Sequence, residues 1–250
     1  MNRKMVTLAG KGTGVRAVQA AILIVAGTAV GMLLRRMVFL RRCGCLIPAK
    51  RLYRRGAYAL GGLIWIAMLT QEIILLAAGL LNWRTGLPLH LCSLTGLITL
   101  PVLATENRTL WQITVYLGMP GALMALLFPS VVETPWPQLT ALAFHTMHAL
   151  VFLAPLLPMG LGWLPDVRGA LRSWLAMVVL GLAVMAVNAL LGSNYLFLGW
   201  PVEGTPLTAL AAHGMTGYRL ALAAICTGVI ALEGLAAWLA GRWGRNVKCG

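Results

Sequence analysis

Residues 87–103 read LPLHLCSLTGLITLPVL, an apolar run long enough to enter a lipid bilayer that nevertheless contains His90 and Cys92. Ionisable groups at membrane depth cost about 2.5–3.5 kcal/mol each on insertion scales, so they are rare there and tend to mark functional sites. The run therefore predicts a membrane-embedded helix and, within it, a candidate site.

The composition of the whole chain is that of a membrane protein. Of its 250 residues 60% are hydrophobic and only 10% are charged, and the mean hydropathy is +0.84. A soluble domain carries about 25% charged residues. Several apolar stretches of roughly 18–25 residues have the length that a helix needs to cross a hydrocarbon core of about 30 Å. We therefore expect an all-α fold, a polytopic bundle of transmembrane helices.

Charged residues and turn residues divide the chain into about seven expected spans. These cover residues 16–34, 57–81, 87–104, 110–128, 139–157, 173–198 and 215–240. Gly118, Pro120 and Gly121 predict a kink in the fourth span. No low-complexity linker separates the spans, so we expect a single integral membrane domain over 1–250. It comprises the first span at 16–34, a basic loop at 35–56, a six-span core at 57–240 and a basic tail at 241–250.

The net charge of +14 is concentrated between and beyond the spans. Because an excess of Lys and Arg marks cytoplasmic loops, we expect the 35–56 loop and the C-terminus in the cytoplasm, the N-terminus outside, and the protein in the cell membrane. The same loop is expected to contact anionic lipid head groups. Nucleic acid is not an expected partner, since the basic residues do not alternate with aromatic residues that could stack on bases.

The five cysteines do not form the pattern of a disulfide framework. Cys43 and Cys45 lie in the basic loop, where they could be acylated or bind a metal ion. Two reduced cytoplasmic thiols are the simpler interpretation. The sequence gives no reason to expect a resident cofactor.

Polar side chains recur near one surface of the expected bundle, opposite the basic loop. Five spans contribute to the set, which comprises Glu72, His90, Cys92, His145, His148, Asn188, Asn194, Tyr195, His213 and Arg219. Random placement would scatter such groups over both halves of the membrane. We therefore expect one shared cavity that opens to the outer leaflet or to the extracytoplasmic space.

Helical geometry limits which of these groups can act together. Residues two apart on a helix point to roughly opposite faces, so His90 cannot readily serve Cys92 as a base. His145 and His148 are three apart and share a face, so either could. A cysteine nucleophile in apolar surroundings needs such a neighbouring base. Glu72 could orient the imidazole and complete a Cys–His–Glu relay.

Each residue also has a purely structural interpretation. Cys92 could be a small apolar filler, and His90 could bond to a carbonyl of a neighbouring helix. Tyr195 could be an interfacial anchor, and Arg219 could extend toward head groups. His90, His145, His148 and Glu72 are also donors suited to zinc or iron. Because HxxxH and HExxH spacings are absent, however, we expect no metal site.

Four motifs resemble those of a known family. They are LPLHLCSL at 87–94, GMPGALMALLFP at 118–129, FHTMHALVFLAP at 144–155 and GSNYLFLGWP at 192–201. Their order and approximate spacing resemble the YwaF-type integral membrane proteins. That family is distantly similar to a vertebrate transmembrane protein that looks like a Cys-dependent acyltransferase, which moves fatty acyl groups between phospholipids. Its arrangement also resembles multipass lipid hydrolases with a Thr–His pair.

The resemblance implies a nucleophile at Cys92 and a base at His148 rather than His145, because LVFLAP follows His148. Met124 replaces a commonly polar residue of the family, and Thr216-Gly217-Tyr218 stands where Pro-Trp-Tyr is frequent. The resemblance thus predicts a lipid acyltransferase or acyl hydrolase that acts on membrane phospholipid esters. In this hypothesis Glu72 and His90 assist the pair, Asn194 and Tyr195 stabilise the oxyanion, and His145, Asn188 and Arg219 contact substrate.

Two hypotheses of other classes remain open from the sequence. The first is a non-enzymatic protein that binds or transports a small molecule or lipid in a polar cavity open to the outer leaflet. The second is a membrane scaffold whose 35–56 loop docks a cytoplasmic partner or anionic lipid. The oligomeric state is not predicted.

Overall fold

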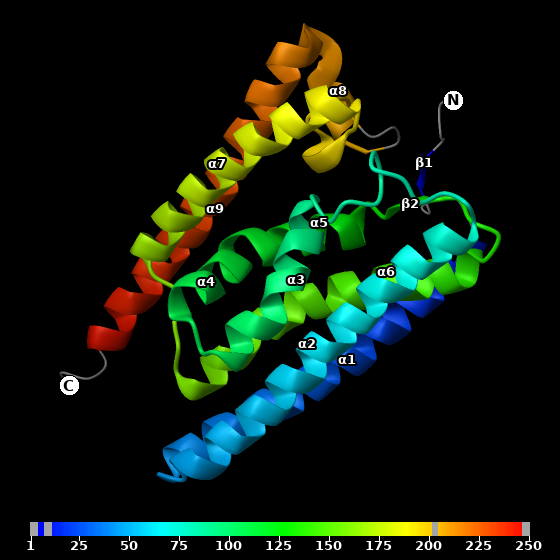
Figure 1. Ribbon diagram of the computed structural model, residues 1–250. Coiled ribbons are helices and arrows are strands. Elements are labelled where there is room, and N and C mark those ends of the chain that lie inside the picture. The colour runs from blue at the N-terminus through cyan, green and yellow to red at the C-terminus, as the bar shows by residue number, and fades with distance from the viewer. Residues whose placement is uncertain (1–4, 8–11, 202–204, 247–250) are drawn as a thin grey trace.

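The computed structural model describes residues 5–7, 12–201 and 205–246, which form a helical bundle with one short strand pair (Figure 1). The α-helices are α1 (Gly12–Arg42), α2 (Leu46–Ala77), α3 (Leu91–Ala104), α4 (Arg108–Ile113), α5 (Met119–Leu127), α6 (Pro137–Leu153), α7 (Val167–Leu191), α8 (Leu207–Leu210) and α9 (Gly214–Asn246). A π-helical segment, Thr114–Gly118, joins α4 to α5, and 3-10 segments occupy Ala154–Leu161, Tyr195–Phe197 and Ala211–His213. Strands β1 (Met5–Thr7) and β2 (Ser130–Val132) pair antiparallel.

Six helical stretches are long and apolar enough to cross a membrane. Within the described residues these are Arg16–Arg42, Leu46–Ala77, Arg108–Leu127, Pro137–Leu161, Val167–Leu191 and Gly214–Arg242. The third predicted span, 87–104, corresponds to α3, which has 14 residues. At 1.5 Å per residue α3 is about 21 Å long, shorter than a hydrocarbon core of about 30 Å. The predicted all-α, polytopic bundle is confirmed.

The crossings alternate in direction, and α1 begins at the opposite end of the bundle from the end of α9 (Figure 1). One end carries the longer connections 78–90, 128–136 and 192–213, and we call it the loop end. The other carries the short connections 43–45, 105–107 and 162–166, and we call it the turn end. The sequence predicts that the turn end faces the cytoplasm.

The segment predicted as a basic loop at 35–56 is a helical hairpin. Helix α1 continues through Arg35 and Arg36 to Arg42, and only three residues, 43–45, separate it from the start of α2 at Leu46. Lys and Arg have good helix propensity, and positive charge at a helix C-terminus is favourable, so the charges do not end α1. Gly44, with φ +75°, makes the sharp reversal possible.

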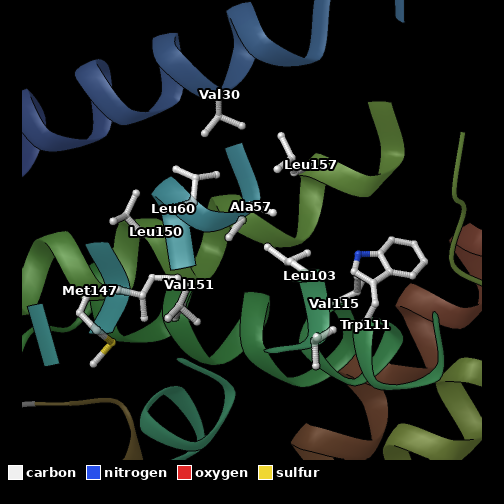
Figure 2. Packing of buried hydrophobic residues seen from close by; sticks show 14 of the residues in the cluster. Val30, Ala57, Leu60, Leu103, Trp111, Val115, Met147, Leu150, Val151 and Leu157 are labelled. Carbon is white, nitrogen blue, oxygen red and sulfur yellow. The ribbon is translucent and has the colours of Figure 1, made fainter. Parts of the chain in front are cut away.

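The core lies where α1, α2, α3 and α6 meet. Figure 2 shows Val30 of α1, Leu60 of α2 and Leu150 of α6 converging there, and all three are buried. Gly61 permits a close approach of α2 to α3, because a Cβ at this position would lie 2.7 Å from Leu100 Cβ. Small residues at crossings are the usual means by which membrane helices pack closely.

The predicted kink in the fourth span takes the form of the π-helical segment Thr114–Gly118. Pro120 follows it and has no N–H to donate to an earlier carbonyl, so a regular α-helix is interrupted there. A comparable break follows α6, where Pro158 leaves the carbonyl of Pro155 without its 3-10 partner. The indole N–H of Trp111 donates a hydrogen bond to that carbonyl oxygen at 2.8 Å.

Helices α7 and α9 form an antiparallel pair along one flank of the bundle (Figure 1). They approach closely where a Cβ on Gly234 would lie 3.1 Å from Ala170 Cβ. The expected sixth span, 173–198, extended too far. Helix α7 ends at Leu191 because Gly192 takes the left-handed conformation, with φ +62°. The residues that follow it form a loop.

Candidate functional site

Cys92 is the second residue of α3 and is buried. Its sulfur lies against α5, because a Cβ added to Gly121 would lie 3.4 Å from Sγ. His90 is the N-cap residue of α3, with an extended backbone, and its side chain does not cap the helix. His90 therefore precedes the helix, and the rule that helical residues two apart point to opposite faces does not apply to His90 and Cys92.

The imidazole of His148 is oriented by its own helix. Its Nδ1 atom lies 2.8 Å from the carbonyl oxygen of Phe144, one turn earlier in α6. A carbonyl can only accept, so Nδ1 carries the proton in the neutral ring and Nε2 carries the lone pair. The side chain is buried. In this orientation, the Nε2 atom of His148 can accept a proton.

The helix register places His148 at the height of Cys92. A Cβ on Gly96 would lie 3.3 Å from Val151 Cγ2, so α3 and α6 meet there. The two helices run in the same direction, so one turn toward the loop end leads from Gly96 to Cys92 and from Val151 to Met147 and His148. Cys92 and Met147 share one buried cluster, and Figure 2 shows Met147 beside Val151.

The predicted catalytic pair is not joined directly. Within the described part of the chain, no hydrogen bond links the Cys92 sulfur to a histidine nitrogen. Catalytic hydrogen bonds are often long in ligand-free sites and shorten only when substrate is bound. The roles of Cys92 and His148 stay predictions.

His145 is fully buried, and among the residues that the structure describes neither of its ring nitrogens has a hydrogen-bond partner. It packs edge-on against Phe144, with 5.4 Å between ring centroids. A neutral imidazole has one N–H donor and one acceptor, and burying both without partners is costly. His145 is therefore a buried polar group within α6 whose hydrogen bonds are not supplied by the described part of the chain.

The amide side chains predicted to contact substrate instead hold the loop after α7. Asn188 donates to Tyr195 O at 2.9 Å and accepts from Ser193 Oγ and Tyr195 N. Asn194 donates to Trp200 O and accepts from the N–H groups of Gly199 and Trp200. Both side chains use their hydrogen-bonding capacity within the loop, and Asn194 lies beyond the helix in which it was expected.

Tyr195 connects this loop to the segment before α3. Its hydroxyl donates to Trp83 O at 2.8 Å and accepts from Leu87 N at 2.9 Å. Burial raises the pKa of this hydroxyl above its usual value; the nearby Glu72 carboxyl adds to the rise, and the Leu87 hydrogen bond opposes it. The single O–H of Tyr195 is committed to Trp83 O in this structure, and the predicted oxyanion role of Tyr195 stays a prediction.

His90 packs between two rings of the same loop. Its centroid lies 5.4 Å from that of Tyr195 and 5.2 Å from that of Phe197. Leu196 and Phe197 have positive φ values of 55° and 57°, a strained conformation that occurs often at functional sites. Tyr218 stabilises it by donating to Phe197 O at 2.8 Å. The loop thus fixes the residue that begins α3.

Sequence reasoning missed several residues of this region and one elsewhere. Phe197, Gly121 and Arg84 contact the site, but only the fold brings them there. Glu233 could have been found, because it is a carboxyl inside an apolar span just as Glu72 is. Its Oε2 atom is buried without a partner, as is Ser173 Oγ on α7. Arg219, predicted to contact substrate, holds the loop through Leu198 O.

The structure describes His213 and the basic residues near the two ends of the chain only in part. Only the backbone of His213 is described, at the end of a 3-10 segment. Residues 247–250 of the basic tail, and Arg3, Lys4 and Lys11 before α1, lie outside the described residues. Among the residues that are described, no three His, Cys, Asp or Glu side chains gather closely enough to hold a metal ion.

The fold and the polar groups at the loop end define a polytopic helical membrane protein with a candidate site near one membrane surface. The chain belongs to the TMEM164 family, whose model matches residues 14–232. Neither the curated proteins nor the solved structures contain a match. The matched region includes every predicted site residue from Glu72 to Arg219. It establishes a membrane protein family, while the resemblance to YwaF-type proteins and acyltransferases stays a resemblance.

Proposed function

We propose that this protein is a membrane-embedded acyl-transfer enzyme that acts on phospholipid esters, with Cys92 as nucleophile and His148 as base. The orientation of His148 supports this proposal most strongly. Its Nδ1–H is held by Phe144 O, which leaves Nε2 to accept a proton. The helix register, which puts Cys92 and Met147 one turn above the contact of Gly96 with Val151, supports the pairing of the two residues.

The chemistry divides into two transfers. His148 Nε2 takes the Cys92 proton as sulfur attacks the ester carbonyl, a C–S bond forms, and the C–O bond of the lipid breaks. The proton then passes from Nε2 to the departing lysolipid oxygen. In the second half, an acceptor hydroxyl from a lysolipid or water loses its proton to Nε2 and attacks the thioester. The C–S bond breaks, and the proton returns to sulfur.

The N-terminus of α3 offers an oxyanion site in place of the one predicted. Asn194 and Tyr195 are engaged in the loop, whereas the first N–H groups of a helix have no acceptor within the helix. Cys92 is the second residue of α3, and the His90 side chain does not cap it. In this proposal the first-turn N–H groups of α3, the turn that contains Cys92, and the positive end of the helix dipole stabilise the negative charge that develops on the substrate.

The test is turnover of labelled phospholipid by the purified full-length protein. Cys92→Ser and His148→Gln should each abolish release of labelled lysolipid and acyl product. Cys226→Ser is a matched control, because Cys226 is a free thiol in α9 outside the site. Normal turnover by Cys92→Ser would overturn the proposal. Lipid binding without turnover by the wild-type protein would instead favour a binding or transport function.

A further inference from the structure

Two arginine side chains hold the same loop, one near each of its ends. Arg84, in the segment before α3, donates from Nε to Leu191 O at 2.8 Å. Arg219, near the start of α9, donates from Nε to Leu198 O, also at 2.8 Å. The two carbonyls flank the loop that contains Asn194 and Tyr195. Each guanidinium is therefore fixed in orientation by a backbone contact.

These contacts leave the terminal nitrogens of both side chains unused. A guanidinium has five N–H donors, and the Nε bond uses one of them. For the terminal nitrogens of Arg84 and Arg219, no protein acceptor is found in the part of the chain that the structure describes. Two terminal nitrogens held in one plane form a fork that matches two oxygens of a phosphate group.

Aromatic residues place both forks at the depth of lipid head groups. Trp83 is 74% exposed and Trp200 is 51% exposed, and both flank the loop at the loop end of the bundle. Exposed tryptophans are typical of the membrane–water interface, where lipid phosphates lie. The same loop packs against His90, two residues before Cys92. A lipid whose phosphate lay at these arginines would have its ester groups nearer the apolar core, on the side of Cys92.

Arginines at the turn end are used differently. Arg172 donates from a terminal nitrogen, Nη1, to Thr109 Oγ1 at 3.4 Å. Arg108 stacks on the ring of Trp163, with 4.9 Å from Cζ to the centroid. An arginine that merely extends toward head groups has no need of a fixed Nε contact. Arg84 and Arg219 differ from the turn-end arginines because both donate from Nε to a loop carbonyl.

We propose that Arg84 and Arg219 form the head-group site of the substrate and bind the phosphodiester of a glycerophospholipid through their terminal nitrogens. This inference rests on the proposed function, because it assigns two residues to the head group of the phospholipid substrate proposed there. It makes these two residues determinants of specificity. The enzyme would prefer phospholipids to neutral glycerides with the same acyl chains.

The experiment compares phosphatidylglycerol with diacylglycerol as substrates of the full-length protein in nanodiscs. Arg84→Gln and Arg219→Gln should each lower the ratio of kcat/KM for phosphatidylglycerol over diacylglycerol about tenfold, chiefly through a higher KM for the phospholipid. Glutamine can still donate to the loop carbonyl but lacks the fork. Arg172→Gln is the matched control at the turn end and should keep the wild-type ratio.

Binding measurements separate the outcomes. Native mass spectrometry should show fewer retained phosphatidylglycerol molecules in both variants, and inorganic phosphate should compete only weakly if the lipid is the source of the phosphate. Unchanged ratios in both variants, with turnover still dependent on Cys92, would overturn the head-group site alone. If the wild-type protein shows no turnover but both variants retain less phospholipid than it does, the result would support the head-group site and overturn the proposed chemistry.

Discussion

His148 Nδ1 lies 2.8 Å from Phe144 O within α6, and this contact determines which ring nitrogen can accept a proton. Because the carbonyl cannot donate, the neutral ring carries its proton on Nδ1 and its lone pair on Nε2. The fold places that ring at the height of Cys92, near the N-terminus of α3. The proposed chemistry depends on this arrangement.

The tautomer of His148 can be measured directly. In protein labelled with ¹⁵N-histidine, the His148 signal should show a protonated Nδ1 and an unprotonated Nε2 at neutral pH. His148→Gln identifies the signal by its loss and should lower turnover by about 10²–10⁴-fold, the usual contribution of a general base. A protonated Nε2 in the wild-type protein would contradict the assigned role.

Gly121 should be needed for access to the Cys92 sulfur. The Cβ of Gly121→Ala would lie 3.3 Å from Leu91 Cδ2 and 3.4 Å from Cys92 Sγ, so we expect lower turnover with little loss of stability. Gly121→Val should have a larger effect. Gly62→Ala is the control, because nothing lies within 4 Å of the added atom. Equal turnover by the Gly121 and Gly62 variants would show that space at the sulfur does not matter.

Tyr195→Phe should act mainly on stability. The change leaves Trp83 O and Leu87 N without their hydrogen-bond partner. Orphaned polar groups cost roughly 1–3 kcal/mol when they are fully buried, and less at partly buried contacts such as these two. We expect a lower thermal unfolding midpoint and only a modest decrease in turnover, because the loop that packs against His90 is loosened. Loss of activity as complete as that of Cys92→Ser, at unchanged stability, would return Tyr195 to a catalytic role.

The flank formed by α7 and α9 should be stabilised by removing polar atoms that have no partner. Ser173 Oγ and Glu233 Oε2 are buried and form no hydrogen bond within residues 5–7, 12–201 and 205–246. Ser173→Ala and Glu233→Met should each raise the thermal unfolding midpoint, since they remove an unpaired hydroxyl or an unpaired carboxyl group. Thr227→Ala should lower it, because Trp174 Nε1 donates to Thr227 Oγ1 at 3.1 Å. Lower stability in both of the first variants would reveal a partner for these groups.

The sequence predicted the helices better than their ends. Apolar runs of sufficient length indicated the spans, because the bilayer imposes that length. Arg35 and Arg36 suggested an end to the first span, yet arginine is a good helix former and α1 continues to Arg42. Gly192, which does end α7, was read as part of a longer span, because a single glycine in an apolar run does not reveal its φ.

The candidate site was predicted in part. The order of the spans predicts the depth of each residue in the membrane. From it we predicted that the polar groups lie near one surface. Whether a polar side chain is already hydrogen-bonded depends on contacts between distant segments, such as the contact of Tyr195 with Trp83. Residue spacing alone does not reveal such contacts. The same holds for Arg84, whose partner Leu191 lies 107 residues away. Glu233 was visible in its span and was overlooked.

The central claim is tested most directly by trapping the acyl group on the protein. Full-length protein is mixed with a phospholipid of defined acyl chain, quenched in acid and measured by intact and peptide mass spectrometry. We expect a hydroxylamine-sensitive acyl adduct on Cys92 in the wild-type protein, more of it when the acceptor is withheld, and none in Cys92→Ser. Phospholipid turnover without any adduct, or an unchanged rate in Cys92→Ser, would contradict a thiol nucleophile in this site.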